Sequence, residues 1–248
     1  MDTSQMFGTE KISKVLFKMA PPVMLAQLIQ ALYNIVDSLF VGRYAETGLT
    51  ALSIVYPLQL LMIALAVGAG VGINTVMAAK LGVGRQKEAQ RYAGMGARLA
   101  LAIWALFALV CWIIMPGYAA MSTSSPEIID EVVAYGRIVC LFSFGLFLES
   151  AWTKVLQAQG DMKTPMIAQI LGAITNIVLD PIFIFIFQMG VQGAALATII
   201  SQALSAIWVI AFLTSSKSQL KIRFCLMKPD KTILKAMPGL GISPFIMQ

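Results

Sequence analysis

The chain has 248 residues, of which 58% are hydrophobic and only 12% are charged, and its formal net charge is +6. A soluble domain carries about 25% charged residues, so this composition excludes a soluble globular protein and indicates an integral membrane protein. Histidine is absent, which excludes histidine-based catalytic triads and histidine metal sites. The three cysteines, Cys111, Cys140 and Cys225, are far apart and match no metal or redox spacing.

Six apolar runs are long enough to cross a bilayer as helices, which requires about 20 residues each. In chain order they cover residues 20–41, 51–79, 92–115, 128–152, 164–187 and 193–213. The first run is too long for the apolar part of a signal peptide, and no cleavage pattern follows it. The sequence therefore predicts an all-α membrane protein, with a bundle of six transmembrane helices within residues 14–213.

The basic residues predict how this bundle is oriented. If the odd-numbered spans run outward, every lysine and arginine except Arg43 and Arg137 falls on one side of the membrane. Cytoplasmic loops are enriched in basic residues, so both ends of the bundle are predicted to be cytoplasmic. The basic excess is then a signal of topology, and we expect no nucleic acid among the partners.

The residues after the sixth span indicate how the chain continues. Residues 214–236 are polar and basic and are predicted to form a cytoplasmic loop between two lobes, whereas residues 237–248 turn apolar again. The stretch "KAMP" at 235–238 repeats the "KMAP" at 18–21 with two residues exchanged, as expected where a tandem repeat restarts. We therefore expect 237–248 to begin a seventh helix, and the chain to be the first half of a protein about twice as long.

Outside the acidic loop 121–131, which overlaps the start of the fourth run, three acidic residues lie within the predicted spans, Asp37, Glu149 and Asp180, although an ion in hydrocarbon costs several kcal/mol or more. Asp37 is sixteen residues after Pro21, and Asp180 is fifteen after Pro165, on two spans that both run outward. At about 1.5 Å per residue, both carboxyl groups lie about 23–24 Å from those prolines. We therefore predict that Asp37 and Asp180 occupy the same depth and can meet in a packed bundle.

Further polar groups are predicted near that depth. Asn176 shares a helix face with Asp180, and Pro181 interrupts the backbone hydrogen bonding and is a candidate hinge. The remaining candidates are Tyr33, Asn34, Thr198, Ala194 one turn before Thr198, and Glu149 about two turns from the cytoplasmic end of its span. Oxygen ligands suit a proton or a hard cation such as Na⁺, with Asp37 and Asp180 as its metal ligands. The alternative is that each carboxyl group only hydrogen-bonds a neighbouring helix and fixes the packing.

Four stretches together resemble the multidrug and toxic compound extrusion (MATE) family. They are "PPVMLAQLIQALYNIVDSLFVGR" (21–43), "AAKLGVGRQKEAQRYAG" (78–94), "VLQAQGDMKTPM" (155–166) and "TNIVLDPIFIF" (175–185). The resemblance implies one six-helix lobe of a two-lobe, twelve-helix transporter with a V-shaped cleft. In that family the N-terminal lobe holds a cation site whose positions match Asp37, Asn176, Asp180 and Thr198 here, with a backbone oxygen at Ala194 as a further ligand.

The function that the resemblance implies is an antiporter of a bacterial cell membrane, and not an enzyme. It would export cationic or amphipathic organic compounds in exchange for H⁺ or Na⁺, with no other cofactor, and would need the missing C-terminal lobe and the lipid bilayer as partners. One alternative is a lipid-linked saccharide flippase, but its cleft needs basic residues and only Arg98 and Arg137 come near. An intramembrane aspartyl protease is a second alternative, but the Tyr-Asp and Gly-x-Gly-Asp patterns of such enzymes are absent. A packing module without transport is the third.

Overall fold

The structure is a computed structural model that describes residues 11–215. Helices joined by short turns make up this part of the chain. Their bounds are α2 (Ile12–Tyr44), α3 (Glu46–Gly82), α4 (Gln86–Ser122), α5 (Pro126–Leu141), α6 (Phe144–Ala158), α7 (Lys163–Pro181), the π-helix η1 (Ile182–Ile186) and α8 (Gly190–Thr214).

The prediction of an all-α bundle with six transmembrane segments is confirmed. Six helical segments of the described residues are long and apolar enough to cross a membrane, and α5 with α6 forms the fourth of them. Five segments extend beyond their predicted spans at both ends, because helices continue into polar and charged residues that carry no hydropathy signal, whereas the fifth covers 163–186 against the predicted 164–187. Residues 216–236 of the predicted loop, the predicted helix start at 237–248 and Cys225 lie outside the described residues.

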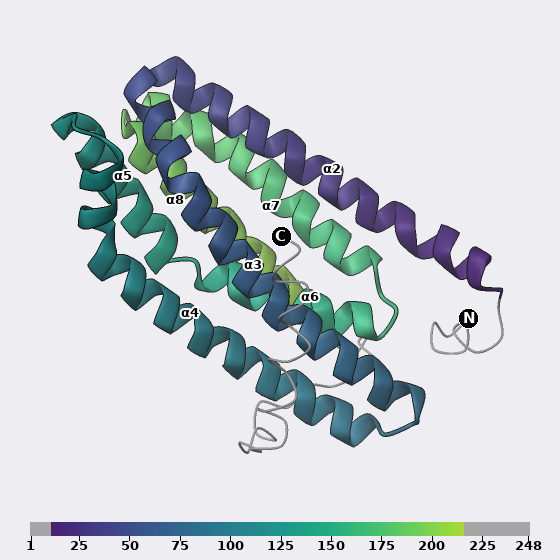
Figure 1. Ribbon diagram of the computed structural model, residues 1–248. Helices are drawn as coiled ribbons and strands as arrows, with labels where there is room; N and C mark the ends of the chain where they lie inside the picture. The colour runs from purple at the N-terminus through teal and green to yellow at the C-terminus, as the bar shows by residue number, and fades with distance from the viewer. Residues whose placement is uncertain (1–10, 216–248) are drawn as a thin grey trace.

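Successive segments run in alternating directions along the bundle (Figure 1). The start of α2, the α3–α4 turn and the α6–α7 turn lie at one end, and the α2–α3, α4–α5 and η1–α8 turns lie at the other. The first end is the one that the basic residues predict to be cytoplasmic. We refer to it below as the inner end, and to the opposite end as the outer end.

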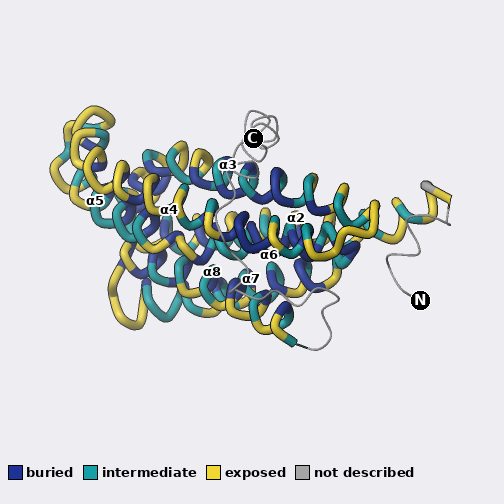
Figure 2. Tube along the Cα trace, turned by 90° about the horizontal axis from the view of Figure 1, so that it is seen from below, coloured by how far each residue is buried: buried dark blue, intermediate teal, exposed yellow. Residues whose placement is uncertain are grey.

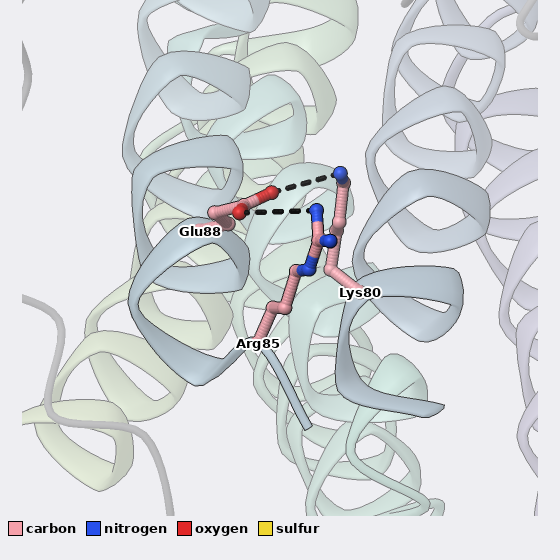
Figure 3. A network of polar contacts seen from close by, with 3 residues as sticks. All are labelled: Lys80, Arg85 and Glu88. Atoms are coloured by element: carbon pink, nitrogen blue, oxygen red, sulfur yellow. Dashed lines mark hydrogen bonds and ion pairs between the residues drawn. The ribbon is translucent and has the colours of Figure 1, made fainter. Parts of the chain in front are cut away.

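The α3–α4 turn at the inner end carries a network of charges (Figure 3). Lys80 Nζ lies 2.8 Å from Glu88 Oε2, and Arg85 Nη1 lies 3.5 Å from Glu88 Oε1. Gly84 has φ +76° at this turn, a conformation that glycine adopts without a steric cost. The two long helices therefore meet in a short hairpin whose charged side chains face solvent.

The helix α2 lies at the edge of the bundle, mainly against α7 (Figure 1). Only 6% of its most apolar window is buried, compared with 44% for the segment formed by α5 and α6. Figure 2 shows exposed residues along much of α2 and buried residues on the inward sides of the other helices. An apolar helix can keep such an exposed face because lipid, and not water, surrounds a membrane bundle.

Small residues bring α3 and α6 into close contact. A Cβ atom added at Gly70 would lie 2.8 Å from Lys154 Cγ and 3.1 Å from the Ser150 carbonyl oxygen. Across the same contact, Ser150 Oγ donates to the Ala66 carbonyl oxygen at 2.9 Å, and Asn74 Nδ2 donates to the Lys154 carbonyl oxygen at 2.9 Å. These bonds satisfy polar groups inside the bundle and fix the position of α6.

The fourth span, which the hydropathy predicts as one run, is broken into two helices. The α-helical pattern stops after Leu141 and restarts at Phe144, and Ser143 Oγ donates to the Cys140 carbonyl oxygen at 2.8 Å. A Cβ atom added at Gly145 would lie 2.9 Å from the Ala203 backbone nitrogen. The break therefore lets the start of α6 pack directly on the backbone of α8.

The bend predicted near Pro181 is a change from α-helical to π-helical hydrogen bonding. Proline has no N–H to donate to the preceding turn, and α7 ends at this residue. The following residues form η1, where the Phe187 amide donates to the Ile182 carbonyl oxygen at 2.9 Å. The chain then turns through Gln188 and Gly190, both with positive φ, into α8.

Candidate functional site

The carboxyl groups of Asp37 on α2 and Asp180 on α7 lie close enough to interact directly. Asp37 is 9% exposed and Asp180 is fully buried. The two residues meet because α2 packs on α7 and because they lie at similar distances along the chain from Pro21 and Pro165 on those helices. Two carboxylate oxygens so close repel each other unless a proton or a metal cation lies between them.

Asn176 and Thr198 complete a buried polar cluster with the two acids. Asn176 Nδ2 donates to Asp180 Oδ1 at 3.4 Å and to Thr198 Oγ1 at 3.5 Å. Both side chains are buried, Asn176 one turn before Asp180 on α7 and Thr198 on the adjacent α8. Three helices therefore contribute to the cluster, and the long bonds leave it loosely held.

Three buried oxygen atoms of this cluster have no hydrogen-bond partner within the described residues. They are Asp37 Oδ1, Asn176 Oδ1 and Asp180 Oδ2. A buried acceptor without a donor costs about 1–3 kcal/mol, and more if it is charged. All three are hard oxygen acceptors, which fit H⁺ or Na⁺. No group of three or more His, Cys, Asp or Glu residues in the described range could hold a metal ion, so the donor set does not resemble a transition-metal centre.

Two cavities adjoin the cluster. The first, of about 320 Å³, is lined by Asn176, Thr198, Tyr33 and Glu149 among others. The second, of about 250 Å³, is lined by Asp37, Thr198 and Tyr33 among others. Asp37 thus borders only the second cavity and Asn176 only the first, whereas Tyr33 and Thr198 border both.

The other predicted site residues occupy different places around the cluster. Asn34 lines the second cavity, and its carbonyl oxygen accepts a hydrogen bond from Ser38 Oγ at 2.9 Å. Ala194 is fully buried one turn before Thr198, within the regular part of α8, and Pro181 follows Asp180 at the end of α7. Glu149 lines the first cavity and lies outside the contact of the two aspartates. The roles of these residues stay predictions.

Two polar features of the site were not anticipated from the sequence. Gln59 Nε2 donates to the Tyr135 hydroxyl at 3.0 Å, and both residues line the cavity that contains Asp37. Lys154, whose charge belongs to the basic residues of the inner end, lines the other cavity and donates from Nζ to Gln157 Oε1 at 2.9 Å. In the sequence, these residues are visible only as isolated polar residues inside apolar runs. Hydropathy does not show which of these residues contact one another in the folded bundle.

Comparison with known proteins places the chain among membrane transporters. A family model described as MatE matches residues 22–182. The multidrug export protein MepA of Staphylococcus aureus is 25% identical over 250 residues, which covers 100% of this chain and 55% of that protein. MepA of Staphylococcus haemolyticus shows the same identity and coverage. The chain thus spans about half the length of the curated relatives it matches.

Solved structures give the same result. A MATE structure in the bent conformation superposes with a TM-score of 0.91 at 25% identity, covering 99% of this chain and 55% of that one. A MOP superfamily transporter from Pyrococcus furiosus superposes with a TM-score of 0.89 at 25% identity, covering 99% of this chain and 53% of that one. The six-helix bundle therefore corresponds to about half of each of these transporters.

Proposed function

The chain belongs to the MatE family of membrane transporters, and from this premise we propose that it is the N-terminal lobe of a cation-coupled multidrug antiporter. As a member of this family it is a multi-pass protein of the cell membrane and not an enzyme. The antiporter exports cationic or amphipathic organic compounds in exchange for H⁺ or Na⁺. Loop 214–236 joins the lobe to a second one, whose first helix starts at 237–248.

The observation that carries the proposal is the buried pair of Asp37 and Asp180, each of which, like Asn176 beside them, has a buried oxygen without a donor. Structural contacts between membrane helices can be made with side chains that are less costly to bury. Two acids in contact, with Asn176 and Thr198 beside them, form a site that is stable only when a cation neutralises it. Such a site suits a coupling ion, because its charge changes each time the ion binds or leaves.

The mechanism follows from that change of charge. In the loaded state, H⁺ or Na⁺ is held by Asp37 and Asp180, with Asn176, Thr198 and the backbone oxygen of Ala194 as further ligands. Neutralisation lets α2, α7 and α8 pack closely, whereas the unloaded acids repel each other. Pro181 and the π-helix after it are the point where α7 bends between the two arrangements. A ligand shifts such an equilibrium only by its different affinity for the two states, so drug and cation must favour opposite arrangements.

The proposed substrates and second lobe rest on the relatives. MepA is named a multidrug export protein, and this chain covers 55% of its length. An antiporter of this family needs two lobes to form its cleft, so we propose that the C-terminal half completes the substrate site. No feature of the described part of the site favours a flippase or an aspartyl protease.

The test is gradient-driven efflux of a cationic dye from cells that express the whole gene product. Asp37→Asn and Asp180→Asn keep the shape of each side chain but remove its charge, and each should abolish efflux. The matched control is Asp130→Asn, since Asp130 is an exposed carboxylate on α5, and it should export dye like the wild type. All three proteins are quantified in isolated membranes. Wild-type efflux by both site variants would refute the proposal, and collapsing the Na⁺ or the H⁺ gradient separately would identify the ion.

A further inference from the structure

The two cavities beside the acid pair extend toward opposite ends of the bundle. The cavity with Asp37 reaches Leu49 and Ser53, near the start of α3 at the α2–α3 turn. The cavity with Asn176 reaches Lys154 and Gln157, near the end of α6 at the α6–α7 turn. Those two turns lie at opposite ends of the molecule (Figure 1). We call the first the outer cavity and the second the inner cavity.

The outer and inner cavities share two wall residues at the level of the acids, Tyr33 and Thr198. Thr198 is held by its hydrogen bond from Asn176. The Tyr33 hydroxyl forms no hydrogen bond with the other described residues around the two cavities. Of the two shared wall residues, Tyr33 has the larger side chain. Tyr33 is therefore the wall residue that can move without breaking the polar cluster.

From this arrangement we propose that the two cavities are the outer and inner halves of a cation route through this single lobe, with Tyr33 as the barrier between them. The inference rests on the proposed function and deepens it, because it assigns the route of the coupling ion. The ion enters beside Asp37, is held by the acid pair, and leaves past Asn176 into the inner cavity. Its route does not need the cleft that the exported compound uses.

Glu149 is the group that receives the ion in the inner cavity. It lines that cavity together with Asn176 and precedes Lys154 on α6 by five residues, or about 7.5 Å along the helix. Lys154 is bound to Gln157 through its Nζ atom and lies closer to the inner end. An ion that leaves the acid pair therefore meets the Glu149 carboxylate before it passes the positive charge of Lys154.

The barrier is tested by the leak of cations in the absence of any exported compound. The whole gene product is reconstituted in liposomes, and the uptake of ²²Na⁺ or the collapse of a pH gradient is followed. Tyr33→Ala should raise the leak by at least about tenfold, which corresponds to about 1.4 kcal/mol of lost barrier, and Tyr33→Phe should not. The control Tyr44→Ala removes the same side chain from the same helix at a position that lines neither cavity. A folded Tyr33→Ala protein that does not leak would overturn the proposal.

The route itself is tested by labelling single cysteines, introduced after Cys111, Cys140 and Cys225 have been replaced by serine, and this readout does not depend on transport. Ser53→Cys in the outer cavity should react with a membrane-impermeant thiol reagent in right-side-out vesicles, and Gln157→Cys in the inner cavity should react only in inverted vesicles. Labelling of both positions from the same side would refute the route even if the dye-efflux test supports the proposed function. Correct labelling with normal efflux in the aspartate variants would instead reject the proposed function and leave two water-filled cavities.

The role of Glu149 has its own readout. Glu149→Gln should slow coupled efflux several-fold while the equilibrium affinity of the protein for the cation stays unchanged, because the ion is still held by the two aspartates. A variant with unchanged efflux, or with an affinity lowered as much as in Asp180→Asn, would show that Glu149 is not the receiving group.

Discussion

The contact between α6 and α8 gives the sharpest prediction about the stability of this bundle. Gly145 lies at the start of α6, where a methyl group would meet backbone atoms of the opposite helix: Ala203 N at 2.9 Å, Gln202 C at 3.0 Å and Ala203 Cα at 3.1 Å. Backbone atoms cannot rotate away as a flexible side chain would. In the variant Gly145→Ala, the two helices must therefore separate.

The size of the effect follows from these distances. Ordinary carbon contacts begin at about 3.4 Å, so the helices must move apart by roughly 0.5 Å, and overpacking of this kind costs about 1–3 kcal/mol. Alanine is favoured over glycine inside a helix by about 0.5–1 kcal/mol, which offsets part of that cost. Central values of about 2 and about 0.75 kcal/mol leave a net loss of about 1.25 kcal/mol, or a decrease of about 2.5–5 °C in Tm for a domain of this size.

The chain offers a matched control of opposite sign. Gly117 lies within α4, and no atom of the described residues is within 4 Å of the position where its Cβ would be. Gly117→Ala should therefore gain the higher helix propensity of alanine without any steric cost, and should raise Tm by about 1–4 °C. The assay is thermal unfolding of the purified protein in one detergent, followed by tryptophan fluorescence. Equal stability of Gly145→Ala and the wild type, or shifts of the same sign in both variants, would refute the packing argument.

Three further variants test local interactions by the same assay. Asp161→Ala removes a carboxylate that accepts hydrogen bonds from the Thr164 amide at 3.1 Å and the Thr164 hydroxyl at 2.6 Å at the start of α7. The loss should lower the free energy of unfolding by about 0.5–2 kcal/mol, and Asp161→Asn should keep most of the wild-type stability. Ser205→Ala removes the hydrogen bond from Ser205 Oγ to the Ala168 carbonyl oxygen at 2.9 Å and should lower the free energy of unfolding by about 1 kcal/mol. An unchanged stability would mean that water replaces the hydroxyl. Glu88→Gln should leave Tm unchanged, because exposed ion pairs contribute little to stability; a clear decrease would show that the charged hairpin holds α3 and α4 together.

The sequence was sufficient to predict the depth of a residue in the membrane where a regular helix converts residue number into distance along its axis. Counting from Pro21 and Pro165 predicted that Asp37 and Asp180 share a level, and the two side chains are in contact. Hydropathy also predicted six spans, but it placed the end of the third at residue 115, whereas α4 continues to Ser122. A helix that leaves the hydrocarbon needs no apolar residues, so composition cannot mark its end.

Other features could not be predicted, because they depend on contacts between distant segments. The helix is broken before Phe144, where α6 contacts the backbone of α8. No local sequence pattern in this uniformly apolar run predicts the break. The hydrogen bond of Gln59 to Tyr135 joins residues that are 76 positions apart. That Tyr33 borders two separate cavities follows only from the three-dimensional packing of several helices.

The sparse burial of α2 has a consequence for how a small ion can move a large helix. This helix packs mainly against α7, with smaller contacts to α3, α8 and η1, and most of its surface faces outward. Its carboxyl group at position 37 touches α7 at that same seam. Because α2 is the least buried of the six spans, adding or removing one positive charge at position 37 acts on the helix that the rest of the bundle constrains least.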